Sequence, residues 1–155
     1  MLEKVLSGGQ TGVDRAALDV AIEMGIPHGG WCPAGRDADD GKIPDKYQLN
    51  ETAEIDHTVR TEYNVRDSDA TLMIFRGKLH GGTAYAIEMA KHLDKPAMAI
   101  NLDLDVDEEE IIDWFVTNNI KVLNVGGQRE TKNPGIYFQS RILFNKVFGS
   151  LKDKG

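Results

Sequence analysis

Residues 70–75, with the sequence Ala-Thr-Leu-Met-Ile-Phe, form an apolar run of strand length in which apolar and polar side chains do not alternate. A strand with one solvated face alternates, so this run indicates a strand buried on both faces, as in a parallel sheet. A helical segment is predicted before it, at residues 57–69, and another after it, at residues 83–93. This stretch therefore favours a sheet that is covered by helices on both faces.

The same alternation of strands and helices continues along the chain. Strands joined by helices form right-handed crossovers and an open parallel sheet. The length of 155 residues suits one domain, so we expect a single α/β domain over residues 1–155, with a mainly parallel sheet of about five or more strands flanked by helices. The remaining strands are predicted at residues 5–6, 26–31, 96–102 and 120–125, and the remaining helices at residues 12–24, 107–118 and 136–151.

Charge and composition exclude several classes of function. The formal net charge of −7 argues against general binding to nucleic acids or to a membrane surface, because both need a basic face. No apolar run approaches the ~20 residues that cross a bilayer, and no signal-peptide pattern is present, so we expect a cytoplasmic protein.

Cys32 is the one cysteine. It is a candidate soft metal ligand or reactive thiol, and the alternative is a small apolar residue at a strand end.

A glycine-rich turn, Ser7-Gly8-Gly9-Gln10-Thr11-Gly12-Val13-Asp14, links the first strand to the first helix. In such a turn, backbone N–H groups and a helix N-terminus converge on an anion, usually a phosphate. Gln10 and Thr11 add hydrogen-bonding groups. The spacing matches neither the dinucleotide nor the Walker fingerprint. The turn is thus a candidate phosphate site, and the alternative is an ordinary tight turn.

A second glycine turn, Gly81-Gly82-Thr83, repeats this arrangement after the buried strand, with Thr83 as a possible helix N-cap. Ligands of open α/β sheets bind at the carboxyl ends of the strands, where both turns are expected. Arginine suits bidentate contact with phosphate, although a solvated surface arginine is the alternative for each one. The arginines predicted in or beside these loops are Arg36, Arg60, Arg66, Arg76 and Arg129.

Between residues 32 and 52 no periodicity is found, which is typical of a binding lid or a disordered loop. Asp37, Asp39 and Asp40 lie in it, just before Gly41. Carboxylates in such a run can bind hydrated Mg²⁺ or orient a hydroxyl-rich ligand. The alternative is a solvated acidic loop.

Five blocks of the sequence together resemble the molybdenum carrier family, whose members are similar to molybdenum-cofactor carrier proteins. That family belongs to a broader Rossmann-like group with the LOG, or "lysine decarboxylase-like", proteins and the DprA-type proteins. The resemblance runs from Lys4 to about Phe148. The blocks are SGGQTGVDRAAL at residues 7–18, GWCPAGR with DGKIP at residues 30–36 and 40–44, RTEYNVRDSDATL at residues 60–72, GGT at residues 81–83, and LNV through PGIY at residues 123–137.

The resemblance implies a Rossmann-like domain, a homo-oligomer, and a phosphorylated small-molecule ligand held on one of the glycine turns. That ligand would be molybdenum cofactor or a related phosphorylated pterin or nucleotide. Arg36, Arg66 and Arg129 would supply positive charge, and Asn64 and Asp69 would orient polar edges of the ligand. The full predicted binding set is Gly8, Gly9, Gln10, Thr11, Gly12, Arg36, Asn64, Arg66, Asp69, Gly81, Gly82, Thr83 and Arg129.

The related group also contains phosphoribohydrolases with a Gly-Gly-x-Gly-Thr-x-x-Glu signature, so a nucleotide hydrolase is the alternative function. This sequence departs from that signature, since Thr83 follows Gly82 directly and the residue three beyond it is Ala86. Acid–base candidates for such an enzyme are Asp40, Glu62 and Glu88. A DprA-type nucleic-acid module is a third hypothesis, which the net charge disfavours. We expect a binding protein rather than an enzyme.

Overall fold

The computed structural model describes residues 1–153 and contains a five-stranded sheet with the strand order β2-β1-β9-β7-β8. Every neighbouring pair in this sheet is parallel, as the sequence predicts. The sheet is built from β1 (Lys4–Leu6), β2 (His28–Gly29), β7 (Ala70–Phe75), β8 (Ala97–Asn101) and β9 (Val122–Gly127).

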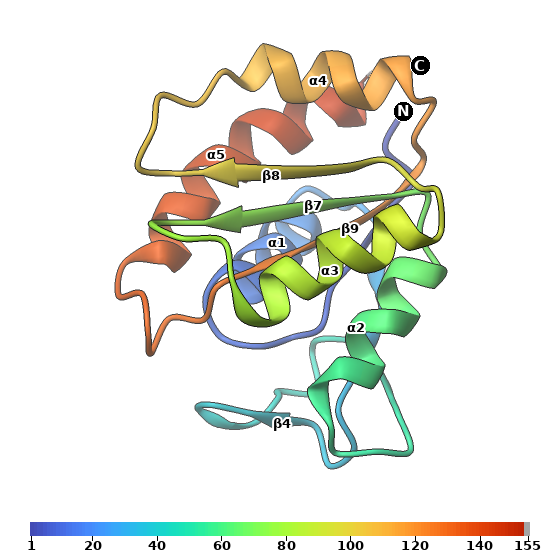
Figure 1. Cartoon of the computed structure of the whole chain (residues 1–155), viewed down its shortest axis with the longest axis vertical. Coiled ribbons are helices and arrows are strands. Elements are labelled where there is room, and N and C mark those ends of the chain that lie inside the picture. Colours follow the sequence, from blue (N-terminus) through green and yellow to red (C-terminus); the bar gives the residue numbers. More distant parts are fainter. Residues whose placement is uncertain (154–155) are drawn as a thin grey trace.

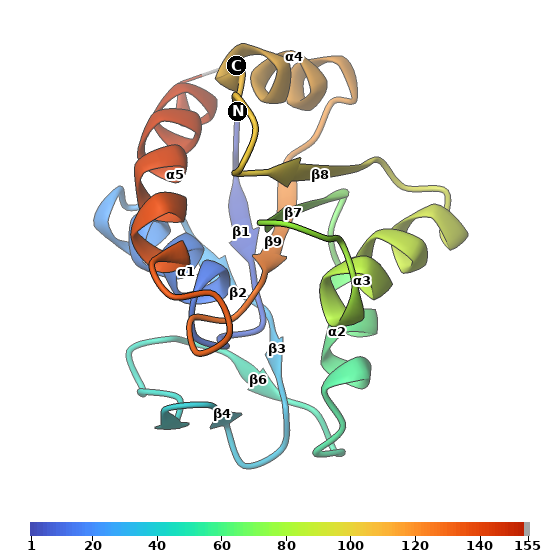
Figure 2. The same cartoon turned by 60° about the vertical axis from the view of Figure 1, so that its left-hand side comes forward.

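Helices cover both faces of the sheet (Figure 1). Figure 2 shows α1 (Val13–Glu23) and α5 (Ile136–Lys152) on one face, and α2 (His57–Arg66) and α3 (Gly81–His92) on the other. The fifth helix, α4 (Glu108–Thr117), packs on α5 and shares its core. This is the Rossmann-like α/β arrangement that the sequence predicts.

Strand β7, which lies between β9 and β8, is buried on both faces, and this explains its largely apolar sequence. Leu72 and Ile74 lie in the main core together with Phe144 of α5, while Met73 points to the opposite face and packs with Val65 of α2 and Ala86 of α3. Successive side chains of a strand alternate between faces, so a strand with two covered faces is apolar at most positions. The polar exception, Thr71, accepts a hydrogen bond from Asn124.

Some predicted boundaries are wrong. Helix α3 begins at Gly81, and its N-cap is His80 rather than Thr83, which lies inside the first turn. Helix α2 ends at Arg66, three residues before the predicted end, with Asp67 as its C-cap. The glycines at 126 and 127 belong to β9 rather than to the following loop, because they pair with Met73 and Ile74 of β7.

The long segment between residues 32 and 52 is ordered by short strands and a small core of its own. β3 (Trp31–Cys32) pairs with β6 (Asn50–Glu51), and β4 (Asp37–Ala38) pairs with β5 (Gly41–Lys42) in a hairpin, here called the 37–42 hairpin. Beneath it lies an apolar cluster in which the Cys32 thiol is buried, and this burial raises the pKa of the thiol. The cluster consists of Leu18, Cys32, Ala38, Ile43, Tyr47 and Leu49.

Candidate functional site

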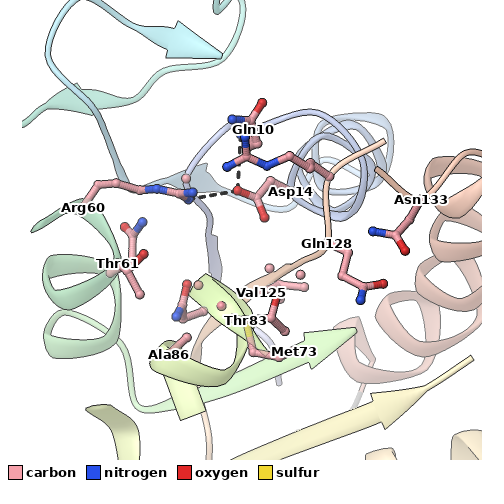
Figure 3. A pocket seen from close by; sticks show the side chains of 18 of the residues that line it. Gln10, Asp14, Arg60, Thr61, Met73, Thr83, Ala86, Val125, Gln128 and Asn133 are labelled. Atoms are coloured by element: carbon pink, nitrogen blue, oxygen red, sulfur yellow. Dashed lines mark hydrogen bonds and ion pairs between the residues drawn. The ribbon is translucent and has the colours of Figure 1, made fainter. Parts of the chain in front are cut away.

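The carboxyl ends of β1, β9 and β7 border a cavity of about 320 Å³ (Figure 3). The chain runs from β1 outward to β2 on one side and from β7 outward to β8 on the other, so the strand order changes direction here. A crevice at such a switch point is where open α/β sheets bind ligands. The walls come from the loop after β1, from α2, from the start of α3 and from the loop after β9.

Seven of the predicted binding residues line this cavity. They come from four separate segments of the sequence, and the fold brings them to one edge of the sheet, as the positions of the loops predict. They are Gly8, Gln10, Asn64, Gly81, Gly82, Thr83 and Arg129.

The first turn of α3 is open toward the cavity. Within residues 1–153, the N–H groups of Gly81, Gly82 and Thr83 have no hydrogen-bond partner. A Cβ atom added to Gly81 or Gly82 would meet nothing within 4 Å, so ligand atoms can approach the backbone closely. The amides and the positive end of the helix dipole together favour an anion at this position.

Other helices have their N-termini occupied by carboxylates of the chain. Asp56 accepts a hydrogen bond from an amide at the start of α2, and Asp107 does so for α4. Glu130 accepts from Gly135 and Tyr137 at the start of α5, at 2.6 and 2.9 Å. The N-terminus of α3 differs from these, because no side chain of the described residues caps it.

The glycines of the first turn are packed against other parts of the molecule. A Cβ at Gly8 would collide with the Arg60 guanidinium, and a Cβ at Gly12 would lie 2.5 Å from the carbonyl oxygen of Gln128. Gly12 also has φ +86°, a value that side chains disfavour. These glycines therefore let the turn pack tightly, while their own backbone is covered.

Asp14 and Arg60 form a buried ion pair in the cavity wall, and the predicted binding set missed both. The Arg60 guanidinium donates to Asp14 Oδ2 at 3.1 Å, and the Gln10 amide donates to the same oxygen at 3.2 Å (Figure 3). Burial raises the pKa of the Asp14 carboxyl, and the charge of Arg60 opposes that rise. The sequence signal that could have revealed Asp14 is its place as a carboxylate in the first helical turn after the glycines.

Amide side chains of β9 and of the loop after it add to the polar lining. Asn124 donates to the Thr71 hydroxyl at 3.2 Å, and Gln128 bonds both backbone groups of Arg76, at 2.8 and 3.0 Å. Gln128 thus fixes the loop after β7 to the loop after β9. Lys132 also lines the cavity and adds a positive charge.

The structure places three other predicted residues outside this cavity. Arg36 donates to backbone carbonyls of residues 43–49 and so holds its own loop together. Arg66 pairs with the neighbouring Asp67 at 2.8 Å. Asp69 lies at the amino end of β7, where it accepts from the amides of residues 121 and 122 at 3.0 and 2.8 Å.

The remaining residues of the first turn lie behind the cavity. A Cβ at Gly9 would meet Leu49 and Ile43 of the small core at 2.7 and 3.0 Å. Thr11 and Gly12 border a separate shallow depression of about 270 Å³, which Tyr47 and other residues complete.

The three acid–base candidates also lie apart from the main cavity. Asp40 is held by Arg15 through two hydrogen bonds of 2.9 Å, and the guanidinium lowers the pKa of its carboxyl. Glu62 accepts from the Tyr85 hydroxyl at 2.5 Å, and Glu88 is exposed on α3. Of the carboxylates in the described residues, Asp14 is the one that lines the cavity.

The acidic run predicted as a Mg²⁺ candidate forms ion pairs of its own. Asp37 faces His57 at 3.4 Å, Asp39 pairs with Arg129 at 3.0 Å, and Asp40 pairs with Arg15. Within residues 1–153, no group of three or more His, Cys, Asp or Glu side chains is placed to hold a metal ion. Over the same range, no helix has both the length and the apolar character needed to cross a membrane.

The fold and the crevice define an α/β protein with a cavity at the switch point of a parallel sheet. Residues 5–148 match the model of the "circularly permutated YpsA SLOG family". The chain belongs to this family.

A search of solved structures and a search of curated proteins give different outcomes. The chain is similar to the crystal structure of a "putative molybdenum carrier protein" from Syntrophus aciditrophicus SB, with 47% identity and a TM-score of 0.90. The similarity covers 95% of this chain and 94% of that one, which confirms the resemblance drawn from the sequence blocks. The search of curated proteins found no match.

Proposed function

We propose that the protein is a carrier, which holds a small phosphate-bearing ligand in the cavity without transforming it. The observation that carries this proposal is the open N-terminus of α3, whose three free amides face a cavity that also contains Lys132 and Arg129. Backbone amides at a helix N-terminus and a lysine are complementary to a phosphate group.

The ligand class that we propose is molybdenum cofactor or a related phosphorylated pterin or nucleotide. The name of the similar protein from Syntrophus supports it, and so does the chemistry of the cavity. Its volume of about 320 Å³ lies at the lower end of the ~300–1,000 Å³ range of small-molecule sites. The phosphate would lie on Gly81, Gly82 and Thr83, and the amide of Asn124 and the carboxyl of Asp14 offer hydrogen bonds to a polar heterocycle.

Native mass spectrometry of freshly purified protein tests whether a pterin or nucleotide co-purifies. Calorimetric titration with a pterin phosphate and with nucleoside monophosphates then measures affinity in Lys132→Met, which we expect to be weakened about tenfold, since one charge-assisted contact is lost. Lys121→Met is the matched control, because this exposed lysine precedes β9 at the opposite edge of the sheet. Absence of binding by every phosphorylated compound, or equal loss in both variants, contradicts the proposal.

A nucleotide hydrolase is the second candidate, favoured by the Asp14 carboxyl. A buried carboxyl with a raised pKa in a ligand cavity is suited to general acid–base catalysis. Release of free base or inorganic phosphate from a panel of nucleotides, lost in Asp14→Asn, would favour this function. Absence of turnover from the wild type would argue for the carrier, whereas turnover that persists in Asp14→Asn would exclude Asp14 as the acid–base group.

A further inference from the structure

The cationic side chains of the cavity are not equally available to a ligand. Arg60, Arg129 and Lys132 are the lysine and arginine residues in its lining. Arg60 is paired with Asp14 at 3.1 Å, and Arg129 with Asp39 at 3.0 Å. Within the described residues, Lys132 takes part in no ion pair. The positive charge left for a ligand is therefore that of Lys132 together with the N-terminus of α3.

Asp39 is held beside Arg129 by further contacts of its side chain and its backbone. Its second carboxylate oxygen accepts from the Thr131 hydroxyl at 2.6 Å, and its backbone amide donates to Gln10 Oε1 at 2.9 Å. The adjacent Asp40 is bound to Arg15 by two hydrogen bonds, and the small core lies beneath the hairpin. The 37–42 hairpin thus presents a carboxylate to Arg129 from a position that is held by both backbone and side-chain contacts.

We propose that Asp39 is a specificity-determining residue, which limits the negative charge of the ligand that the cavity accepts. This inference rests on the proposed function. A ligand with a single phosphate is satisfied by the α3 amides and Lys132. A second phosphate that reached toward Arg129 would meet the Asp39 carboxylate already bound there. The two negative charges would then repel each other. The cavity would thereby prefer one phosphate group over a chain of phosphates.

Orthophosphate and pyrophosphate are the probes that test this inference, because they differ in charge but carry no heterocycle. Their affinities are measured by following the amide resonances of Gly81 and Gly82 during titration at fixed ionic strength. We expect the wild type to bind pyrophosphate no more tightly than orthophosphate. In Asp39→Asn we expect the affinity for pyrophosphate to rise about tenfold and that for orthophosphate to rise about twofold or less.

Two further variants separate charge from hairpin stability. Asp37→Asn removes an exposed carboxylate of the same hairpin, and Thr131→Val removes the hydroxyl contact to Asp39 while the charge stays. We expect both to keep the wild-type ratio of affinities. A change of that ratio in Thr131→Val, or an unchanged ratio in Asp39→Asn, overturns the role of Asp39. Failure of both anions to bind the wild type and all variants overturns the proposed function itself.

Discussion

The two glycine turns look alike in the sequence, yet they have opposite roles in the structure. In the turn after β1, Gly8 and Gly12 are covered by Arg60 and by the backbone of the loop after β9. In the turn before α3, Gly81 and Gly82 face open space. Both turns follow a buried strand and begin a helix. The comparison shows that a glycine run can either let the chain pack on itself or leave its backbone uncovered.

Gly12→Ala is the substitution that we expect to have the largest effect on stability. The new Cβ would lie 2.5 Å from Gln128 O, and the residue would keep φ +86°. Overpacking and backbone strain each cost about 1–3 kcal/mol, so we expect a loss of at least about 3 kcal/mol, measured by urea denaturation. Gly35→Ala is the control, because Gly35 has φ +81° but open space around it, and it should lose only about 1–2 kcal/mol. Equal losses would show that the packing of the first turn is unimportant.

Arg60→Met tests whether the first turn depends on its ion pair, and its effect should grow with pH. The pKa of Asp14 is raised in the folded state. The contribution of Asp14 to the free energy of unfolding is therefore complete below its unfolded-state pKa of about 4, and it is lost as the pH rises through its folded-state pKa. Without Arg60 that pKa rises further. We expect little loss near pH 4 and about 2–3 kcal/mol at pH 7.5, by urea denaturation at both pH values.

Arg66→Met provides the control for this experiment. Arg66 lies on the same helix, but its ion pair with Asp67 is exposed, so the variant should lose less than about 1 kcal/mol. A pH-independent loss in Arg60→Met, or an equal loss in both variants, would contradict the importance of the buried pair.

Gly82→Ala should have the smallest effect, and it should have the opposite sign. Alanine is favoured over glycine in a helix by up to about 1 kcal/mol, and nothing obstructs the added methyl group, so we expect a gain of about 0.5–1 kcal/mol. Gly81→Ala should instead be destabilising, because Gly81 has φ +60°. Thermal unfolding of the two variants compares them. A loss of stability in Gly82→Ala would mean that the second turn is packed as the first one is.

Much of the fold can be predicted from the sequence, since hydrophobic periodicity depends on local residue order. The strand at residues 70–75 is found with its predicted bounds, and α5 begins at the predicted Ile136. The predicted start of α3 is wrong, because the prediction assumes Thr83 as a capping residue. In the structure this helix begins at Gly81 without a capping side chain.

The site is predicted less completely, because the role of a side chain depends on partners that are distant in sequence. The second glycine turn lines the cavity and the first does so only through Gly8 and Gln10, while Arg36 is used by carbonyls of its own loop. Asp14 and Arg60 are 46 positions apart, and only the tertiary fold shows that they form a pair. Asp69 precedes β7 and therefore lies at the amino edge of the sheet, opposite the edge where the cavity lies. Its place follows from the direction of the strand.

The end of β9 has a consequence for how this cavity can change during evolution. A Cβ at Gly126 would lie 3.0 Å from Asp14 Oδ1, and one at Gly127 would collide with the carbonyl oxygen of Ile74. The central wall of the cavity therefore cannot be altered by exchanging side chains there. New ligand preferences would instead arise in the other walls, which come from α2, the start of α3 and the loop after β9. Divergence of specificity within the family should therefore concentrate in these segments, while the end of β9 stays fixed.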